Sequence, residues 1–303
     1  MVREIFENGI LNPPIFPFIG LSNKFPLLVL SWIELPYHEG VERWIEEDPH
    51  IFAAFRSRHA EYNTLLILYH KDIKSHQEWR EQVIAEKRFP LLHGSYPKSS
   101  TSFFSSQLLI KYEPNAPIYL LEEELRRRGY VLVDGYRLKD ISFKISKLLA
   151  EGKCIRVNES KLSKELGIHR KTVIRLISSL IENKWVSNPV CRFPSFFTPP
   201  GYILAICKME LKSSKQEFVK HIRDDPHVTL AFDIKEGGYN ILLFGAFKSL
   251  EEELEWEVKK GLYLLRSIGK VDIQYFSPKH FVNVNNTKVS LGILDENFMY
   301  FRA

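Results

Sequence analysis

Three basic side chains stand close together in one segment in the middle of the chain: Arg170, Lys171 and Arg175. The apolar positions of the same segment recur every three or four residues, at Val173, Leu176, Ile177 and Leu180. This spacing predicts a helix over 170–183 with a buried apolar back and a basic front. An arginine on such a front can donate two parallel hydrogen bonds to a guanine, and the major groove of DNA admits one helix. The chemistry that these residues predict is therefore base reading.

Two shorter helical patterns come directly before this segment and would hold it in place. The first covers about 138–152 and has its apolar stripe at Ile141, Ile145, Leu148 and Leu149. The second runs from about Glu159 to Leu166, with Asn158 as the expected N-cap. Gly167 then supplies a turn that favours positive φ. Three helices with such short turns predict a winged helix-turn-helix over 138–193.

Positive charge is concentrated in this module. Residues 137–192 carry thirteen Lys and Arg against five Asp and Glu, a balance of +8, whereas the whole chain is only +5. Attraction to phosphate is thus a property of the module, and we expect double-stranded DNA as its partner. The residues expected to contact DNA are Ser160, Lys161, His169, Arg170, Lys171, Thr172, Arg175 and Lys184. The alternatives are the solvated faces of an ordinary helical bundle, or a winged helix used only for protein contacts.

Other classes of function find little support in the motifs. Cys154, Cys191 and Cys207 are too few and too far apart for a disulfide framework or a zinc site, so we expect buried thiols. No phosphate-binding loop, nucleophile elbow or paired-histidine zinc motif occurs, and we expect no cofactor, no metal and no enzymatic activity. No apolar run reaches the roughly 18 residues of a membrane span, and the N-terminus lacks a signal layout. We therefore expect a cytoplasmic protein without membrane contacts.

An internal repeat accounts for much of the remaining chain. When the sequence is shifted by 177 residues, 48–68 falls on 225–245 with nine identities in twenty-one positions, far above chance. The matched residues include Asp48-Pro49-His50 with Asp225-Pro226-His227, Tyr62-Asn63 with Tyr239-Asn240, and, further on, Trp79 with Trp256. The two copies should therefore share one fold.

Each copy predicts the order strand, helix, strand, strand, helix, strand. In the first copy the strands are expected at 26–35, 50–58, 61–70 and 103–112, with helices at 38–47 and 73–86. In the second they are expected at 201–211, 227–235, 238–247 and 270–276, with helices at 214–223 and 249–266. This order is that of a ferredoxin-like βαββαβ sandwich. The predicted fold class is α+β, with a central winged helix-turn-helix flanked by two such sandwiches.

The chain thus divides into six expected parts. They are a Pro/Phe-rich arm (1–25), the first sandwich (26–113), a linker helix and strand (114–137), the winged helix-turn-helix (138–193), the second sandwich (194–280) and a tail (281–303). The arm resembles the end of the DNA-reading module, because 7–13 matches 182–189 with one residue inserted. It is either the remnant of a lost helix-turn-helix or a coincidence of composition.

A winged helix-turn-helix followed by such a sandwich resembles the Lrp/AsnC, or feast/famine, family of transcription regulators over 138–276. The matching motifs are L-x-x-x-L-G-[ILV] and V-x-R within 162–180, D-P-x-V at 225–228, and G-x-Y-[DN] at 237–240. His169 departs from the family, which usually has Ser at this helix cap. The resemblance implies a DNA-binding regulator whose RAM-like sandwiches mediate dimerisation.

The resemblance also implies that an amino-acid effector binds near the G-x-Y-[DN] turn. The residues concerned are Gly237, Gly238, Tyr239 and Asn240. In the first copy Ala60 and Glu61 replace the two glycines, so we expect any effector at the second sandwich. The alternative is a plain hairpin turn.

Two other functions remain open from the sequence. An adaptor would dock the winged helix on the transcription or translation machinery without reading a sequence. An enzyme resembling the siroheme decarboxylases would need convergent His and Arg side chains, for which Arg56, Arg58 and His59 are thin candidates. We expect a homodimer, because two readers bind two half-sites, although two sandwiches on one chain would also be able to pair with each other.

Overall fold

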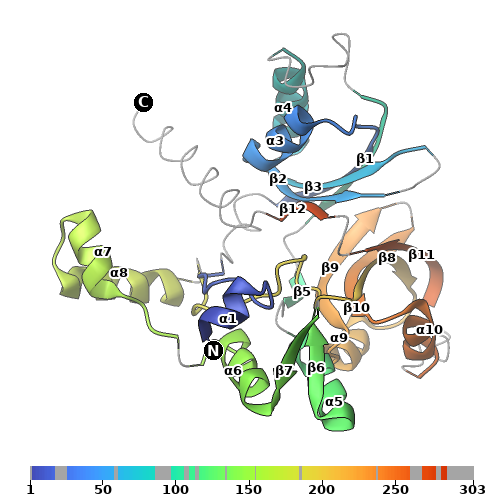
Figure 1. Ribbon diagram of the computed structural model, residues 1–303. Helices are drawn as coiled ribbons and strands as arrows, with labels where there is room; N and C mark the ends of the chain where they lie inside the picture. Colours follow the sequence, from blue (N-terminus) through green and yellow to red (C-terminus); the bar gives the residue numbers. More distant parts are fainter. Residues whose placement is uncertain are drawn as a thin grey trace.

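The computed structural model describes residues 2–17, 26–57, 61–85, 97–105, 109–112, 116–133, 135–153, 155–183, 186–236, 238–259, 268–277 and 281–284. The fold class is the predicted one, α+β, with the helix-turn-helix segment between two antiparallel sheets in the sequence (Figure 1). No helix in these ranges is long and apolar enough to cross a membrane.

The first sheet has the strand order β12-β2-β3-β1-β4. Its own strands are β1 (Leu27–Ile33), β2 (Ile51–Arg56), β3 (Thr64–His70) and β4 (Ser99–Ser105), and the helices α3 (Glu39–Glu47) and α4 (Ile73–Ala85) cover one face. The prediction of a strand over 103–112 is wrong in extent, because the strand begins at Ser99. Serines and a threonine fill the start of this half-exposed edge strand and hide its period.

The second sheet has the strand order β11-β8-β10-β9-β5. Its own strands are β8 (Ile203–Leu211), β9 (Val228–Glu236), β10 (Tyr239–Phe247) and β11 (Ile268–Phe276), with the helices α9 (Lys215–Arg223) and α10 (Leu250–Lys259). The strands and α9 follow the predicted ranges closely, because the apolar runs in β10 and in the first half of β8 are buried. The helix predicted over 249–266 is described as far as Lys259, and 260–267 lie outside the described residues.

Each half gives one strand to the sheet of the other half. Strand β5 (Leu109–Tyr112) follows the first sheet in sequence but pairs with β9, where Leu109 lies opposite Phe232. Strand β12 (Phe281–Val284) follows the second sheet but pairs with β2, where Phe281 lies opposite Phe55. Since β2 and β9 are equivalent in the repeat, the exchange is reciprocal. The tail therefore adds a strand within its own chain.

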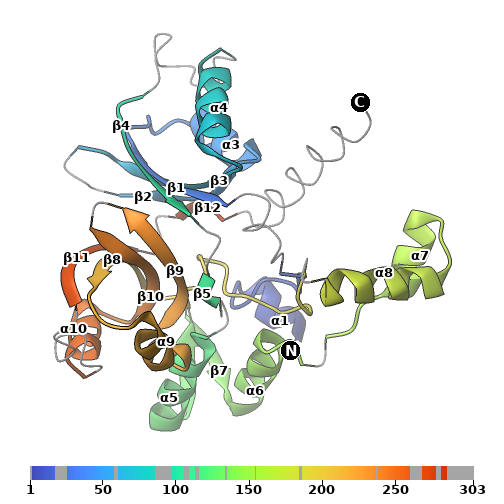
Figure 2. The same ribbon diagram turned by 180° about the vertical axis from the view of Figure 1, so that it is seen from behind.

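The two sheets face each other across one apolar core (Figures 1 and 2). Phe55 of the first sheet packs against Phe276 of the second, with ring centroids 5.2 Å apart. Phe196, from the segment that leads into β8, packs against both Phe55 and Phe244. The sandwiches thus pair within one chain, which answers the question that the sequence left open.

A second core lies beneath the sheets and joins the N-terminal arm to the centre of the chain. It is built by α1 (Val2–Glu7), α5 (Ile118–Arg128), β6 (Tyr130–Val133), β7 (Tyr136–Lys139) and α6 (Asp140–Ala150). Ile5 and Ile10 of the arm are fully buried here beside Phe143 of α6. Backbone hydrogen bonds in both directions join Ile15 to Val190, over 3.1 and 3.0 Å. The arm therefore pairs with the segment that its sequence resembles.

Candidate nucleic-acid interface

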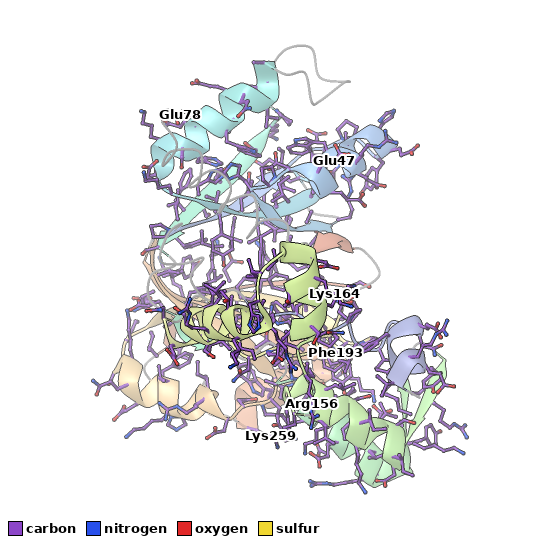
Figure 3. All side chains as sticks on the ribbon, turned by 90° about the vertical axis from the view of Figure 1, so that its left-hand side faces the viewer. Glu47, Glu78, Arg156, Lys164, Phe193 and Lys259 are labelled. Atoms are coloured by element: carbon purple, nitrogen blue, oxygen red, sulfur yellow. The ribbon has the colours of Figure 1, made fainter. Side chains whose placement is uncertain are left out.

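The helix-turn-helix segment forms a hairpin of two helices, α7 (Glu159–Leu166) and α8 (Arg170–Glu182), which we call the α7–α8 hairpin. It extends away from the body of the molecule (Figures 1 and 2), and Figure 3 views it from its own side, with Lys164 on α7 at the front. Asn158 caps α7 as predicted, its side-chain oxygen accepting from the Lys161 amide over 2.9 Å. Gly167 ends α7 at φ +64°, where a glycine carries no steric cost.

His169 caps the start of α8 despite its departure from the family pattern. Its Nδ1 accepts a hydrogen bond from the backbone amide of Lys171 over 3.2 Å. An accepting Nδ1 must be unprotonated, so the cap places the ring proton on Nε2. The ring takes the place of the hydroxyl of a serine cap and leaves His169 exposed beside the basic face.

The basic front of α8 is exposed, and one of its side chains is already engaged. Lys171 and Arg175 are exposed, whereas Arg170 donates from both Nε and Nη2 to Glu159 Oε2, over 3.0 and 2.7 Å. Of the other expected contacts, Ser160 and Lys161 are exposed, Thr172 is half-buried, and Lys184 lies outside the described residues. The Arg170 guanidinium is therefore engaged within the hairpin.

The apolar faces of these helices are only partly buried, and the predicted stripes are wrong on this point. Within the stripe of α8 only Val173 is buried, while Leu176 and Leu180 are 48% and 45% exposed. On α6, Ile141 is 64% exposed and Leu148 is 38% exposed. The reason is that α1 and α5 cover α6 in place of α8. Helical spacing identifies the apolar face but does not say which element covers it.

The turn expected to bind an effector is held to the end of the neighbouring strand β8. The Asn240 side chain accepts from the Leu211 amide and donates to the Leu211 carbonyl, both over 2.7 Å. Asn63 makes the same pair of bonds with Leu35 in the first copy. Gly238 is exposed at φ +93°, and Tyr239 lies under the Lys208 ammonium, 5.4 Å from its ring centre. Gly237 lies outside the described residues.

The arginine considered for porphyrin chemistry is engaged inside the first half. Arg56 is buried and donates to the Thr64 hydroxyl over 2.7 Å and to the Leu35 carbonyl over 3.3 Å. Burial lowers the pKa of this guanidinium, although the Tyr37 ring and Glu42 oppose the change. Arg58 and His59 lie outside the described residues. These hydrogen bonds indicate that Arg56 has a structural role in the first half.

The first half contains a buried histidine cluster that the sequence analysis did not predict. His70 and His76 are 0% and 1% exposed, and the ring centroid of His70 lies 4.4 Å from that of His50 and 4.8 Å from that of His76. Burial lowers the pKa of His76 to about 4, and that of His70 still further. Within the described ranges no group of side chains is arranged to hold a metal ion. The internal repeat could have indicated that His70 is buried, because the equivalent residue in the second copy is Phe247.

The second half buries two carboxyl groups at the corresponding helix. Glu253 and Glu257 of α10 are 2% and 8% exposed, and Tyr275 donates its hydroxyl to Glu253 over 3.0 Å. Burial first, and then the neighbouring Glu257, raise the pKa of Glu253 to about 7.

The expected buried thiols are present among the described residues at Cys191 and Cys207, and Cys154 lies outside them. Burial raises the pKa of Cys191 to about 12.

Comparison of the sequence with models of protein families finds no match, and comparison with curated proteins finds none either. Among solved structures, the crystal structure of the siroheme decarboxylase NirDL matches with a TM-score of 0.51 and 11% identity, over 97% of this chain and 87% of that one. The same enzyme in complex with an iron-uroporphyrin III analogue matches with a TM-score of 0.50 and 10% identity, over 98% and 87%. These likenesses show a shared fold.

Regulators of the AsnC type also appear among the structural neighbours, over about half of the chain. Escherichia coli AsnC matches with a TM-score of 0.34 and 14% identity, over 54% of this chain and 89% of that one.

The expectation that the chain is not an enzyme is contradicted by the structural comparison. It rested on missing motifs, and the structures that share the fold over nearly the whole chain are those of a decarboxylase.

Proposed function

We propose that the chain is a DNA-binding regulator that inserts the N-terminal half of α8 into the major groove. The observation that carries this proposal is the protruding α7–α8 hairpin, whose exposed face presents Lys171 and Arg175. A helix that stands clear of the body can enter a groove about 12 Å wide without a collision of the sheets with the duplex. The concentration of positive charge in 137–192 would draw the same region to phosphate.

The charged side chains divide into two expected roles. Arg175, one turn into α8, is placed to read a base, as is Arg170 once it leaves Glu159. Lys161 on α7, beside Glu165 at 3.7 Å, and Ser160 next to it are placed to contact phosphate. Base contacts give sequence specificity, and phosphate contacts give salt-dependent affinity. Measurements of specificity and of salt dependence therefore distinguish the two groups of side chains.

The test is a binding-site selection from random duplexes, followed by affinity measurements at two salt concentrations. Arg175→Ala should cost about 1 to 3 kcal/mol on the selected site and flatten the sequence preference. Lys161→Ala should weaken all duplexes alike and lower the salt slope by about one. Lys74→Ala, an exposed lysine of α4, is the matched control. Equal losses on every sequence for Arg175→Ala would favour the adaptor instead.

The whole-length likeness to siroheme decarboxylase favours a second candidate function, decarboxylation of a tetrapyrrole. A tetrapyrrole bearing several carboxylates needs cations near its rim, and Arg56 does not supply one because its guanidinium is engaged by Leu35 and Thr64. Titration of the protein with iron uroporphyrin, followed by absorption, tests this candidate. A saturable shift of the main absorption band supports it, and an unchanged spectrum in the micromolar range counts against it.

The expected effector and the expected homodimer remain proposals. Asn240 holds Leu211 by two hydrogen bonds, so an amino acid at this turn would bind to Gly238, Tyr239 and the backbone beside them. A thermal-shift screen of amino acids on the wild type and on Gly238→Asp tests the site. For the homodimer, the apolar sheet faces no longer offer an argument, because they are covered within one chain.

A further inference from the structure

The helix α10 exposes an apolar stripe that the fold does not require. Leu250, Leu254 and Val258 follow one another at intervals of four residues and are 49%, 56% and 63% exposed. The equivalent positions of α4 in the first half are Ile73, Gln77 and Glu81. Because the same fold tolerates Gln and Glu at two of these three positions, the stripe of α10 is not needed to build the sandwich.

The helix α8 exposes apolar side chains as well. Ile174, Leu176 and Leu180 are 40%, 48% and 45% exposed. Leu176 and Leu180, four residues apart, share one side of α8, whereas Ile174 lies on the side of the basic front, three residues after Lys171. Two helices of one chain therefore present apolar surface to solvent.

The charges beside Leu254 of α10 and beside Ile174 of α8 are opposite in sign and stand at the same spacing. On α10, the exposed Glu251 and Glu255 lie three residues before and one residue after Leu254. On α8, Lys171 and Arg175 lie three residues before and one residue after Ile174. On a helix, the residue three positions before is a surface neighbour of the apolar side chain, and the two charges, four residues apart, are surface neighbours of each other. Each helix thus carries one exposed apolar side chain with a pair of like charges along one side of it, acidic on α10 and basic on α8.

The two helices cannot meet within one chain. Figures 1 and 2 place the α7–α8 hairpin and α10 on opposite sides of the body. The segment that follows the hairpin is also tied to the body, because the Ser187 amide donates to the Pro17 carbonyl over 2.9 Å and the Cys191 amide donates to the Leu149 carbonyl over 3.0 Å. We propose that the α7–α8 hairpin of one copy docks on α10 of a second copy, with Ile174 against Leu254 and the lysine and arginine facing the glutamates.

A two-fold arrangement would use this contact twice, since each copy has one hairpin and one α10. Lys171 and Arg175 also belong to the proposed DNA face, so docking on α10 and binding to DNA exclude each other. The association is measured without DNA, and its outcome is separate from that of the proposed regulator function.

The experiment is sedimentation equilibrium of the full chain and of three charge-reversed variants. The wild type should associate beyond the 35.5 kDa monomer with rising concentration. The pair Lys171→Glu and Arg175→Glu, and separately the pair Glu251→Lys and Glu255→Lys, should each raise the dissociation constant roughly tenfold or more. The combination of all four reversals should restore most of the association, because opposite charges meet again.

The matched control is Glu78→Lys, at the position of α4 equivalent to Glu255, which should leave the association unchanged. Thermal unfolding of every variant shows whether it is folded, and Leu254→Gln provides a second, uncharged variant that should also weaken association. A wild type that stays monomeric at the highest concentration would overturn the proposal. An association that survives the reversals on α10, or that the four reversals together do not restore, would overturn it as well.

Discussion

The indole nitrogen of Trp256 donates a hydrogen bond to Oδ2 of Asp225 over 2.8 Å. Its counterpart in the first half, Trp79, donates to Asp48 over 2.9 Å, and in both halves the partners are 31 residues apart. The other oxygen of each aspartate accepts from the amide of the histidine two residues on. The repeated Asp-Pro-His and Trp residues thus form the same hydrogen bonds in both halves, and these bonds join the outer helix to the start of a strand.

Replacement of Trp256 by Phe should destabilise the protein by about 1 to 3 kcal/mol, because a buried carboxylate loses a donor. Urea unfolding followed by circular dichroism measures the change. Trp79→Phe should give a similar value, since the first half contains the same bond. A loss below about 0.5 kcal/mol in both variants would show that the bond adds little.

The histidine cluster predicts a loss of stability in acid. Because burial lowers the pKa of His70 and His76 below the ordinary 6.5, the unfolded chain binds more protons below that pH. Each histidine should then cost about 1.4 kcal/mol for each pH unit below roughly 6.5, a loss that for His76 levels off near its lowered pKa of about 4. His70→Phe, which copies Phe247, should roughly halve this loss between pH 6.5 and 5. Unfolding curves with the same pH dependence as the wild type would contradict the assignment.

Glu253 predicts the opposite dependence. Its pKa is raised from 4.5 to about 7, so between these values the folded state holds a proton that the unfolded chain releases. Stability therefore falls as the pH rises from about 4.5 and levels off above about 7. Glu253→Gln should remove this loss, which amounts to up to about 3 kcal/mol. The control is Glu251→Gln on the exposed side of α10. The difference between the two variants across pH 5 to 8 isolates the buried carboxyl.

Gly152 predicts a local effect at the foot of the α7–α8 hairpin. It adopts φ +74°, and a Cβ there would lie 2.9 Å from the Pro189 carbonyl oxygen and 3.1 Å from a methyl of Val190. Gly152→Ala should therefore cost more than Gly129→Ala, which has a similar φ of +71° and nothing within 4 Å. We expect about 1 kcal/mol at Gly129 and at least about 2 at Gly152 by urea unfolding. Equal costs would mean that the segment at Pro189 moves aside freely.

Glu159 predicts a gain of DNA affinity. Its carboxylate holds Arg170 over 2.7 Å, so Glu159→Gln should free the guanidinium for a base or a phosphate. The affinity for a selected duplex should rise several-fold, and the salt slope should grow by about one. Glu182→Gln removes a negative charge from the same hairpin without releasing Arg170 and is the control. An equal gain of DNA affinity in both variants would show that the change in net charge, and not the release of Arg170, causes the effect.

Much of the fold could be predicted from the sequence because two kinds of signal were strong. The repeat fixed equivalent elements, and Asn63 and Asn240 turn out to make equivalent bonds. Gly167 and Asn158 marked the ends of α7 as their backbone chemistry requires. Such signals are local, and the structure retains them.

Contacts between distant segments could not be predicted in the same way. Leu176 and Leu180 have the spacing of a buried stripe, yet their exposure depends on α1 having taken the place beside α6. The engagement of Arg170 by Glu159 joins residues on two different helices, and no spacing rule favours it over a free arginine. In the candidate site the caps were foreseeable and the partners of the charged side chains were not.

The reciprocal exchange of β5 and β12 also affects how the protein is made. During synthesis the first sheet lacks its outer strand beside β2 until residues 281–284 have left the ribosome. Until then the edge of β2, with Phe55 in the apolar core, has no strand beside it and is open to pairing with other nascent chains. Emergence of residues 281–284 would thus complete the first sheet, and chains that stop before them would be the ones that aggregate.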